Sequence, residues 1–315
     1  MNRSLPVIKP RRLSEGGTIG VVAPGSPPLS DESVHKGISN LEKKGFRVRP
    51  GASVESKRGY LAGSDEERVA DLHSMFQDTT VEAIIAVRGG YGCARLLPLI
   101  DYELIKRNPK LFIGYSDITA LQCALYKRTR LITFAGPMVA ADFGNDIDPD
   151  TENFFWSLIM NGRTNVELSF NHSFESLSVN REFTGPVLGG NLSIIGSLMG
   201  TPYLPDLTGA VLALEEIGEA PYRIDRMINQ LKLGSVFRNL SGIILGQFTN
   251  CVQDNDRPTL TIDEVFGDYF SSMRFSVIKS VPFGHEKQKV TLPIGAFIRY
   301  DPERQSLSLL ESPVL

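Results

Sequence analysis

The first half of the chain alternates short apolar runs with segments of helical periodicity. Residues 18–23 and 83–87 are apolar almost throughout, as in strands that are buried on both faces. Apolar residues recur with helical spacing between positions 34 and 41, and Ser64 and Glu67 form a capping box before a second helical segment. Repeated strand–helix–strand units predict a parallel sheet with helices on both faces, a doubly wound α/β fold.

Residues 111–121 are predicted to form a strand, a tight turn that carries Ser116, and the start of a helix. In a doubly wound sheet, ligands bind at the carboxyl ends of the strands, where this turn would lie. Such a turn exposes the serine hydroxyl, and the helix start offers free N–H groups to an oxyanion. The pattern favours a nucleophile for acyl transfer. The motif is incomplete, because Ile118 stands where G-x-S-x-G has its second glycine, and Ser116 could instead cap the helix.

The second half has a different pattern. Residues 161–185 are polar and rich in serine, which is typical of a crossing between domains. Short strands are then expected at 211–214, 243–245, 277–278, 296–298 and 307–309, with helices at 223–231 and 262–270. The chain is thus expected to have two domains, which its 315 residues permit.

The chain has four histidines, of which one occupies a position suited to catalysis. His35 and His73 fall on amphipathic helices beside charged residues, and His172 lies in the polar crossing, so surface positions are expected for all three. His285 follows Pro-Phe-Gly at the end of a strand and would be presented from a loop on a rigid scaffold.

Two carboxylates, Glu215 and Glu216, come directly after the apolar run 211–214. Strand alternation sends adjacent side chains to opposite faces. One of the two could therefore reach His285, while the other faces solvent or caps a helix.

Composition excludes several classes of protein. The net charge is −3 and no long basic block is present, so nucleic acid is not an expected partner. No window resembles a signal sequence or a membrane span. Cys93, Cys123 and Cys251 are far apart, which predicts neither disulfides nor a thiolate metal site and favours a reducing cytoplasm. Cys93 and Cys123 are expected to be buried small hydrophobic residues.

Six motifs, taken together and in order, resemble the LD-carboxypeptidase family of serine peptidases. They are Val87–Gly92 (VRGGYG), Gly114–Asp117 (GYSD), Phe134–Met138 (FAGPM), Gly189–Leu192 (GGNL), Leu214–Arg223 (LEEIGEAPYR) and Phe283–His285 (FGH). The resemblance runs from about residue 18 to residue 313. It implies that Ser116 is the nucleophile, that Glu215 is the acid of the triad and that His285 is the base.

The resemblance also implies the architecture and the site. It predicts a doubly wound domain over residues 1–165, a crossing over 166–182 and a smaller, mainly β domain over 183–315, with the active site between them. The backbone N–H groups of Gly90 and Asp117 are the expected oxyanion hole. A carboxypeptidase must bind a free carboxylate, for which arginine is suited, and the candidates Arg88, Arg223 and Arg226 remain open.

The substrate implied by the family is a cytoplasmic murein tetrapeptide that loses its terminal D-alanine during cell-wall recycling. No cofactor or metal is expected, since the chain has no H-E-x-x-H motif, and a homodimer is plausible by the same resemblance. Two alternatives stay open. One is an amidase similar to the microcin C immunity proteins, which would cleave peptidyl-nucleotide conjugates, although Trp156 is the only tryptophan and lies outside the motifs. The other is a binding protein without catalysis.

Overall fold

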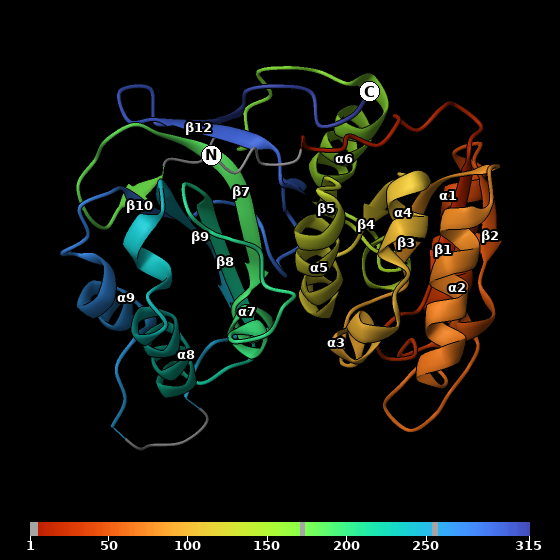
Figure 1. The fold of residues 1–315 in the computed structure, drawn as a ribbon, viewed down its shortest axis with the longest axis horizontal. Coiled ribbons are helices and arrows are strands. Elements are labelled where there is room, and N and C mark those ends of the chain that lie inside the picture. Colours follow the sequence, from red (N-terminus) through yellow and green to blue (C-terminus); the bar gives the residue numbers. More distant parts are fainter. Residues whose placement is uncertain (1–5, 171–173, 254–257) are drawn as a thin grey trace.

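The computed structural model of the chain describes residues 6–170, 174–253 and 258–315. Two β-sheets with their helices lie side by side (Figure 1), and one continuous cluster of buried apolar side chains extends through both halves. No helix within these ranges is both long and apolar enough to cross a membrane.

The first sheet has six strands in the order β11-β5-β4-β3-β1-β2. Its first five strands along the chain run parallel, and the apolar runs of the sequence form them: β1 (Thr18–Val22), β2 (Arg47–Pro50), β3 (Val81–Ala86), β4 (Leu111–Ile113) and β5 (Thr133–Ala135). The edge strand β11 (Leu292–Ile294) comes from the last part of the chain and pairs antiparallel with β5.

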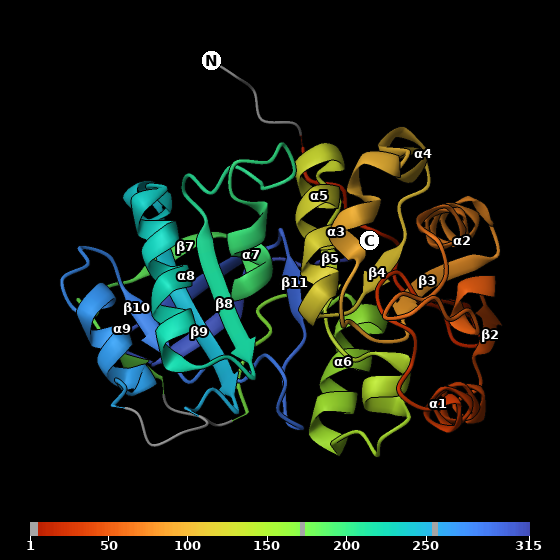
Figure 2. The ribbon, with the colours of Figure 1, turned by 90° about the horizontal axis from the view of Figure 1, so that it is seen from below.

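Helices cover both faces of this sheet. Figure 2 shows α1 (Asp31–Lys43) and α6 (Pro149–Asn161) on one side, with α2 (Asp65–Gln77), α3 (Cys93–Leu96), α4 (Tyr102–Arg107) and α5 (Thr119–Thr129) on the other. Shorter helical turns join them: η1 (Ala52–Val54), η2 (Leu97–Leu99), η3 (Ser116–Ile118) and the π-helical turn η4 (Val139–Phe143). The expected capping box of Ser64 and Glu67 is present at the start of α2. The predicted doubly wound fold is confirmed.

The second sheet has seven strands in the order β13-β12-β7-β8-β9-β10-β6. Its members are β6 (Glu175–Ser176), β7 (Phe183–Asn191), β8 (Val211–Ile217), β9 (Gly242–Thr249), β10 (Val277–Lys279), β12 (Phe297–Asp301) and β13 (Ser306–Leu309). Strands β7 to β10 are parallel, while β6, β12 and β13 are antiparallel to their neighbours. The helices of this half are α7 (Leu192–Leu198), α8 (Pro221–Leu233) and α9 (Ile262–Phe270), with the short η5 (Val236–Asn239).

Three features of the second half differ from the pattern read in the sequence. Strand β7 and helix α7 were not expected, because the glycines of β7 hide its strand character. Strand β6 lies within the polar segment expected to be a crossing. Strand β11 belongs to the expected second domain, yet it completes the first sheet, so the two halves share backbone pairing.

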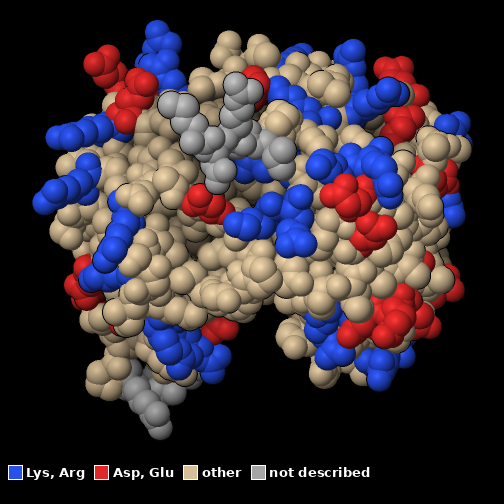
Figure 3. Space-filling view, in the orientation of Figure 1, with Lys and Arg blue, Asp and Glu red and all other residues tan. Residues whose placement is uncertain are grey.

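The halves also meet through helix α5, which packs against β7 and α7. The approach is close, since a Cβ on Gly190 would lie 2.5 Å from the Thr119 hydroxyl oxygen. The space-filling view shows a notch between the halves along the lower edge of the molecule (Figure 3). Both sheets direct the carboxyl ends of their parallel strands toward this region of contact, where ligands are expected.

Candidate active site

Ser116 lies at the sharp turn after β4 and is the first residue of η3. Its φ of 65° is in the left-handed region, which a non-glycine residue adopts at a cost of about 1–3 kcal/mol. The turn is packed against the loop after β3, because a Cβ on Gly89 would lie 3.0 Å from the Ser116 Oγ. Within the ranges that the structure describes, this hydroxyl has no hydrogen-bond partner. The Ser116 side chain therefore does not cap the helix, and its hydroxyl is available to act as a nucleophile.

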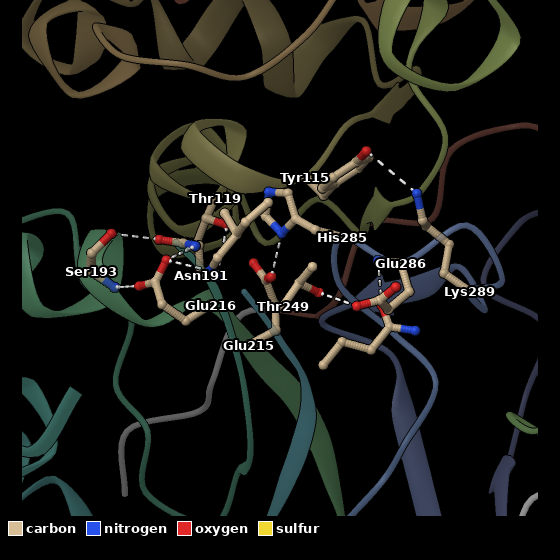
Figure 4. A network of polar contacts seen from close by, with 12 residues as sticks. Tyr115, Thr119, Asn191, Ser193, Glu215, Glu216, Thr249, His285, Glu286 and Lys289 are labelled. Carbon is tan, nitrogen blue, oxygen red and sulfur yellow. Dashed lines mark hydrogen bonds and ion pairs between the residues drawn. The ribbon is translucent and has the colours of Figure 1, made fainter. Parts of the chain in front are cut away.

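Glu215 and His285 form a hydrogen-bonded pair. Glu215 lies at the carboxyl end of β8, and its Oε2 is 2.7 Å from the His285 Nδ1 (Figure 4). Their side chains are only 3% and 12% exposed. The Glu215 Oε1 is buried with no partner among the described residues. A carboxylate at Nδ1 fixes the tautomer that leaves Nε2 free to accept a proton.

The loop that carries His285 is fastened to the end of β9. The Glu286 N–H donates to the Gln247 Oε1 at 2.9 Å, and the Gln247 Nε2 donates to the Gln288 carbonyl at 2.9 Å. The Thr249 hydroxyl donates to the Glu286 carboxylate at 2.8 Å. The loop is thereby held to β9 directly after His285.

Tyr115 brings the serine turn and the histidine loop together. Its ring meets the His285 imidazole edge to face, with centroids 5.0 Å apart and planes at 80°. Because Tyr115 directly precedes Ser116, this contact places the imidazole beside the nucleophile turn. The two predicted catalytic residues that are 169 positions apart in the chain thus share one neighbourhood.

Glu216 has partners of its own and makes no contact with His285 among the described residues. Its carboxylate is 2% exposed and accepts from the Asn191 side-chain amide at 2.8 Å and from the Ser193 N–H, in the first turn of α7, at 2.8 Å. Burial raises the pKa of Glu216 above its usual range, although these hydrogen bonds oppose the shift. Glu216 therefore makes the helix-capping contact that was one of the two options.

The region expected to form the oxyanion hole is ordered by two side chains. The Asp117 carboxylate accepts from the Cys93 N–H at 2.9 Å, and burial raises the pKa of Asp117. The Ser26 hydroxyl accepts from the Tyr91 N–H at 3.0 Å, while Gly90 has a φ of 97°. The Asp117 N–H lies in the first turn of η3, where helical N–H groups lack intrahelical acceptors.

Comparison with known proteins identifies the family. Residues 19–136 match the model of the LD-carboxypeptidase N-terminal domain, and residues 184–299 match that of the C-terminal domain. The chain belongs to the LD-carboxypeptidase family. It is accordingly a hydrolase, a serine-type carboxypeptidase, as the resemblance in its motifs implied.

Relatives within the family carry different names. A probable murein peptide carboxypeptidase of Bacillus subtilis is 39% identical over 91% of this chain and 90% of its own. The microcin C7 self-immunity protein MccF of Escherichia coli is 29% identical over 95% and 94% of the two chains. The crystal structure of a muramoyltetrapeptide carboxypeptidase from Oxalobacter formigenes superposes with a TM-score of 0.83 at 30% identity, covering 93% of this chain and 97% of that one. Its two-domain fold matches this one.

The three candidate arginines of this family member differ in their partners. Arg223 pairs with Glu219 and contacts Tyr222, and Arg226 stacks over the same tyrosine. Arg88 is half-buried, and its guanidinium has no hydrogen bond or ion pair with any residue that the structure describes. Arg88 also directly precedes Gly89, where an added Cβ would lie 2.8 Å from the Ser116 Cβ. The carboxylate-binding role thus stays a prediction, and this geometry favours Arg88.

The other histidines, the cysteines and Trp156 form no hydrogen bond with a triad residue within the described parts of the chain. His35 is exposed, His73 is half-buried and accepts from the Asp101 N–H at 2.9 Å, and His172 lies outside the described residues. All three cysteines are buried free thiols, and burial raises the pKa of Cys123 to about 12 and that of Cys251 to about 11. Trp156 stacks on Phe46 with centroids 4.9 Å apart, next to the first sheet.

Sequence reasoning gave no role to four polar residues near the site. The Asn191 N–H donates to the Thr119 Oγ1 at 3.2 Å, which joins β7 to the helix that follows Ser116. Lys289 and Asp142 form a buried ion pair beside Tyr115 (Figure 4 shows Lys289 and Tyr115). The sequence gave only weak signals for them: Asn191 lies within the motif Gly189–Leu192, and Lys289 follows His285 by four positions.

Proposed function

We propose that this protein is a serine LD-carboxypeptidase that removes the terminal D-alanine from murein tetrapeptides by a Ser116–His285–Glu215 triad. The observation that carries the proposal is the buried 2.7 Å contact between Glu215 and His285, beside a left-handed Ser116 whose hydroxyl is unpaired among the described residues. The 39% identity to a probable murein peptide carboxypeptidase supports the choice of substrate.

In the proposed reaction, the His285 Nε2 takes the proton of the Ser116 hydroxyl as Oγ attacks the scissile carbonyl. The N–H groups of Asp117 and Gly90 stabilise the oxyanion of the tetrahedral intermediate. His285 then gives the proton to the amine of D-alanine as the C–N bond breaks, which leaves an acyl-enzyme on Ser116. Water hydrolyses the acyl-enzyme with His285 again acting as the base, while Glu215 stabilises the imidazolium.

Removing D-alanine from a tetrapeptide leaves a tripeptide, which a recycling pathway in the cytoplasm could reuse. We place the protein in that pathway on the strength of its murein-related relatives. The free carboxylate of D-alanine would bind a cation near the nucleophile, for which Arg88 has the required free guanidinium.

A second candidate is cleavage of a peptidyl-nucleotide conjugate. It rests on the 29% identity to the microcin C7 self-immunity protein over nearly the whole of both chains. Both candidates use the same triad, so only a substrate comparison separates them.

The first test measures D-alanine released from a defined murein tetrapeptide by the purified protein. We expect release by the wild type and a loss of about 10⁶-fold in kcat for Ser116→Ala, because the triad acts as one unit. Ser197→Ala, which changes an exposed hydroxyl on α7, is the matched control and should retain wild-type activity.

Three other results would change the assignment. Release of nucleotide from a peptidyl-nucleotide conjugate, without release of D-alanine, would favour the second candidate. A serine-reactive fluorophosphonate that fails to label the wild type would favour a binding protein without catalysis. Equal labelling of wild type and Ser116→Ala would show that Ser116 is not the nucleophile.

A further inference from the structure

We infer that the buried Lys289–Asp142 ion pair positions His285 against the serine turn and that its balanced charge preserves the imidazole as a base. This inference deepens the proposed function, because it concerns the same triad. Lys289 and Asp142 are positioning residues here, since neither needs to touch the substrate.

The ion pair joins the two halves of the molecule. Lys289 lies in the loop between β10 and β11, and Asp142 lies in η4 of the first half. The Lys289 Nζ is 2.6 Å from the Asp142 Oδ1, and the two side chains are only 5% and 7% exposed. The other oxygen of Asp142 accepts from the Met138 N–H at 2.8 Å, which fixes the carboxylate. The ammonium group therefore has a rigid anchor in the first half.

Tyr115 contacts both the ion pair and the catalytic histidine. The Lys289 Nζ lies 4.7 Å from the centroid of the Tyr115 ring and 3.4 Å from its hydroxyl oxygen. That hydroxyl is also 3.4 Å from the Asp142 Oδ1. The same Tyr115 ring also contacts the imidazole of His285. Tyr115 is thus held between the ion pair and the base, one residue before the nucleophile.

The backbone of Lys289 is fastened as well. Its N–H donates to the Thr151 hydroxyl at 2.8 Å, and this hydroxyl donates to the Lys287 carbonyl at 3.1 Å. Since Thr151 lies on α6, the segment that follows His285 is attached to the first half at two points. A shift of the histidine loop away from Ser116 would have to break both attachments.

Charge balance gives the pair a second effect on the imidazole. Among the described residues, the titratable groups that contact His285, contact Tyr115 or lie on the histidine loop are Glu215 on β8, Tyr115 before η3, Asp142 on η4, and Glu286, Lys287 and Lys289 on the loop itself. Burial and the nearby Asp142 carboxylate raise the pKa of Tyr115 well above its usual range, so the phenol is neutral. Asp142 cancels the field of the Lys289 cation, which would otherwise disfavour the imidazolium formed in the reaction.

A contribution to stability alone does not explain why Lys289 and Asp142 form a buried ion pair. Replacing a buried ion pair by neutral side chains of similar volume is often neutral or stabilising, whereas removing one partner leaves a buried lone charge. The double substitution Lys289→Met with Asp142→Asn therefore separates stability from positioning. Methionine keeps most of the lysine stem, and asparagine keeps an acceptor for the Met138 N–H.

The experiment measures the rate at which a fluorophosphonate labels the protein between pH 5.5 and 9. This probe reacts with an activated serine and needs no murein, so the result does not depend on the proposed substrate. We expect the folded double variant to label at least tenfold more slowly than the wild type. Lys36→Met with Asp146→Asn is the matched control, because that pair has a similar 2.7 Å contact but is exposed.

The single variants test the charge effect. Lys289→Met leaves an uncompensated anion that favours the imidazolium, so the acid limb of the labelling profile should move to higher pH. Asp142→Asn leaves an uncompensated cation, so the limb should move to lower pH. A mere loss of packing would not move the two limbs in opposite directions.

Labelling by the double variant within twofold of the wild type would overturn the positioning role. Limbs that move in the same direction in the two single variants would overturn the charge effect. Where one single variant fails to fold, the double variant still decides the positioning role, and the direction of the limb in the other single variant decides the charge effect. If the wild type labels normally but releases no D-alanine, the proposed substrate is wrong while the inference on Lys289 and Asp142 can still be judged.

Discussion

Ser116 and His285 are held in place by supports of different kinds. The serine owes its position to its own backbone, which turns through a left-handed φ of 65° between a buried strand and a helix. The histidine lies in a loop whose position depends on side chains from other elements, among them Glu215 of the second half and Tyr115 of the first half. The position of the nucleophile therefore depends mainly on the local backbone, whereas the position of the base depends on contacts between the two halves.

Glu215→Gln should give the largest effect on the histidine side. The amide cannot stabilise the imidazolium as a carboxylate does and can favour the wrong tautomer at Nδ1. By analogy with the same change in other triads, we expect kcat to fall about 10⁴-fold. The fold should survive, because the side chain keeps its shape. Kinetics of D-alanine release measures this effect, and a fall of less than tenfold would contradict the role of Glu215.

Gly89→Ala tests the local support of Ser116. The added methyl group would lie 2.8 Å from the Ser116 Cβ and 3.1 Å from the Asp117 backbone nitrogen, so the turn must shift. We expect a loss of roughly 10- to 100-fold in kcat, because small displacements of reacting groups are costly. Gly267→Ala on α9 is the matched control, since nothing lies within 4 Å of its added methyl group. Equal activity of both variants would show that the serine turn tolerates movement.

Glu216→Gln perturbs the carboxylate that joins β8 to the end of β7 and the start of α7, without touching the triad. The carboxylate accepts three hydrogen bonds, from Asn191, Ser193 and Ile217, and an amide cannot accept all three. We expect the free energy of unfolding to fall by about 1–3 kcal/mol near neutral pH. The fall in kcat should be smaller than that of Glu215→Gln. Denaturant unfolding and kinetics of the same samples measure both quantities.

The pH dependence of this variant has a defined sign. Because burial raises the pKa of Glu216, the folded state binds a proton more tightly than the unfolded state. The stability of the wild type relative to Glu216→Gln should therefore decrease as pH rises above about 4.3, the ordinary value for glutamate. A relative stability that increases over this range would mean that the hydrogen bonds outweigh burial.

The local features of the fold were predictable from sequence, and the contacts between distant segments were not. The strand before Ser116 and the capping box at Ser64 follow from residue spacing alone, and the structure confirms them. The expectation that only one of Glu215 and Glu216 reaches His285 agrees with their separate partners. The pairing of β11 with β5 joins residues about 160 positions apart, and no local pattern encodes it. Lys289 and Asp142 are separated by 147 positions, so neither could be assigned a partner.

The smallest expected effects concern whether the two halves unfold together. Each half has a helix with a complete capping box, formed by Ser64 and Glu67 on α2 and by Thr261 and Glu264 on α9. Ser64→Ala and Thr261→Ala should each cost about 1 kcal/mol and leave kcat unchanged. In thermal unfolding this corresponds to about 1–3 °C in Tm.

One core cluster and a shared strand pairing join the halves, so we expect a single transition that both substitutions lower by similar amounts. Two transitions, each sensitive to only one of the substitutions, would mean that the halves are independent folding units. In that case the histidine side could separate from Ser116 without unfolding it. The contacts of Tyr115 with His285 and Lys289 would then be the first to open, because they cross between the halves.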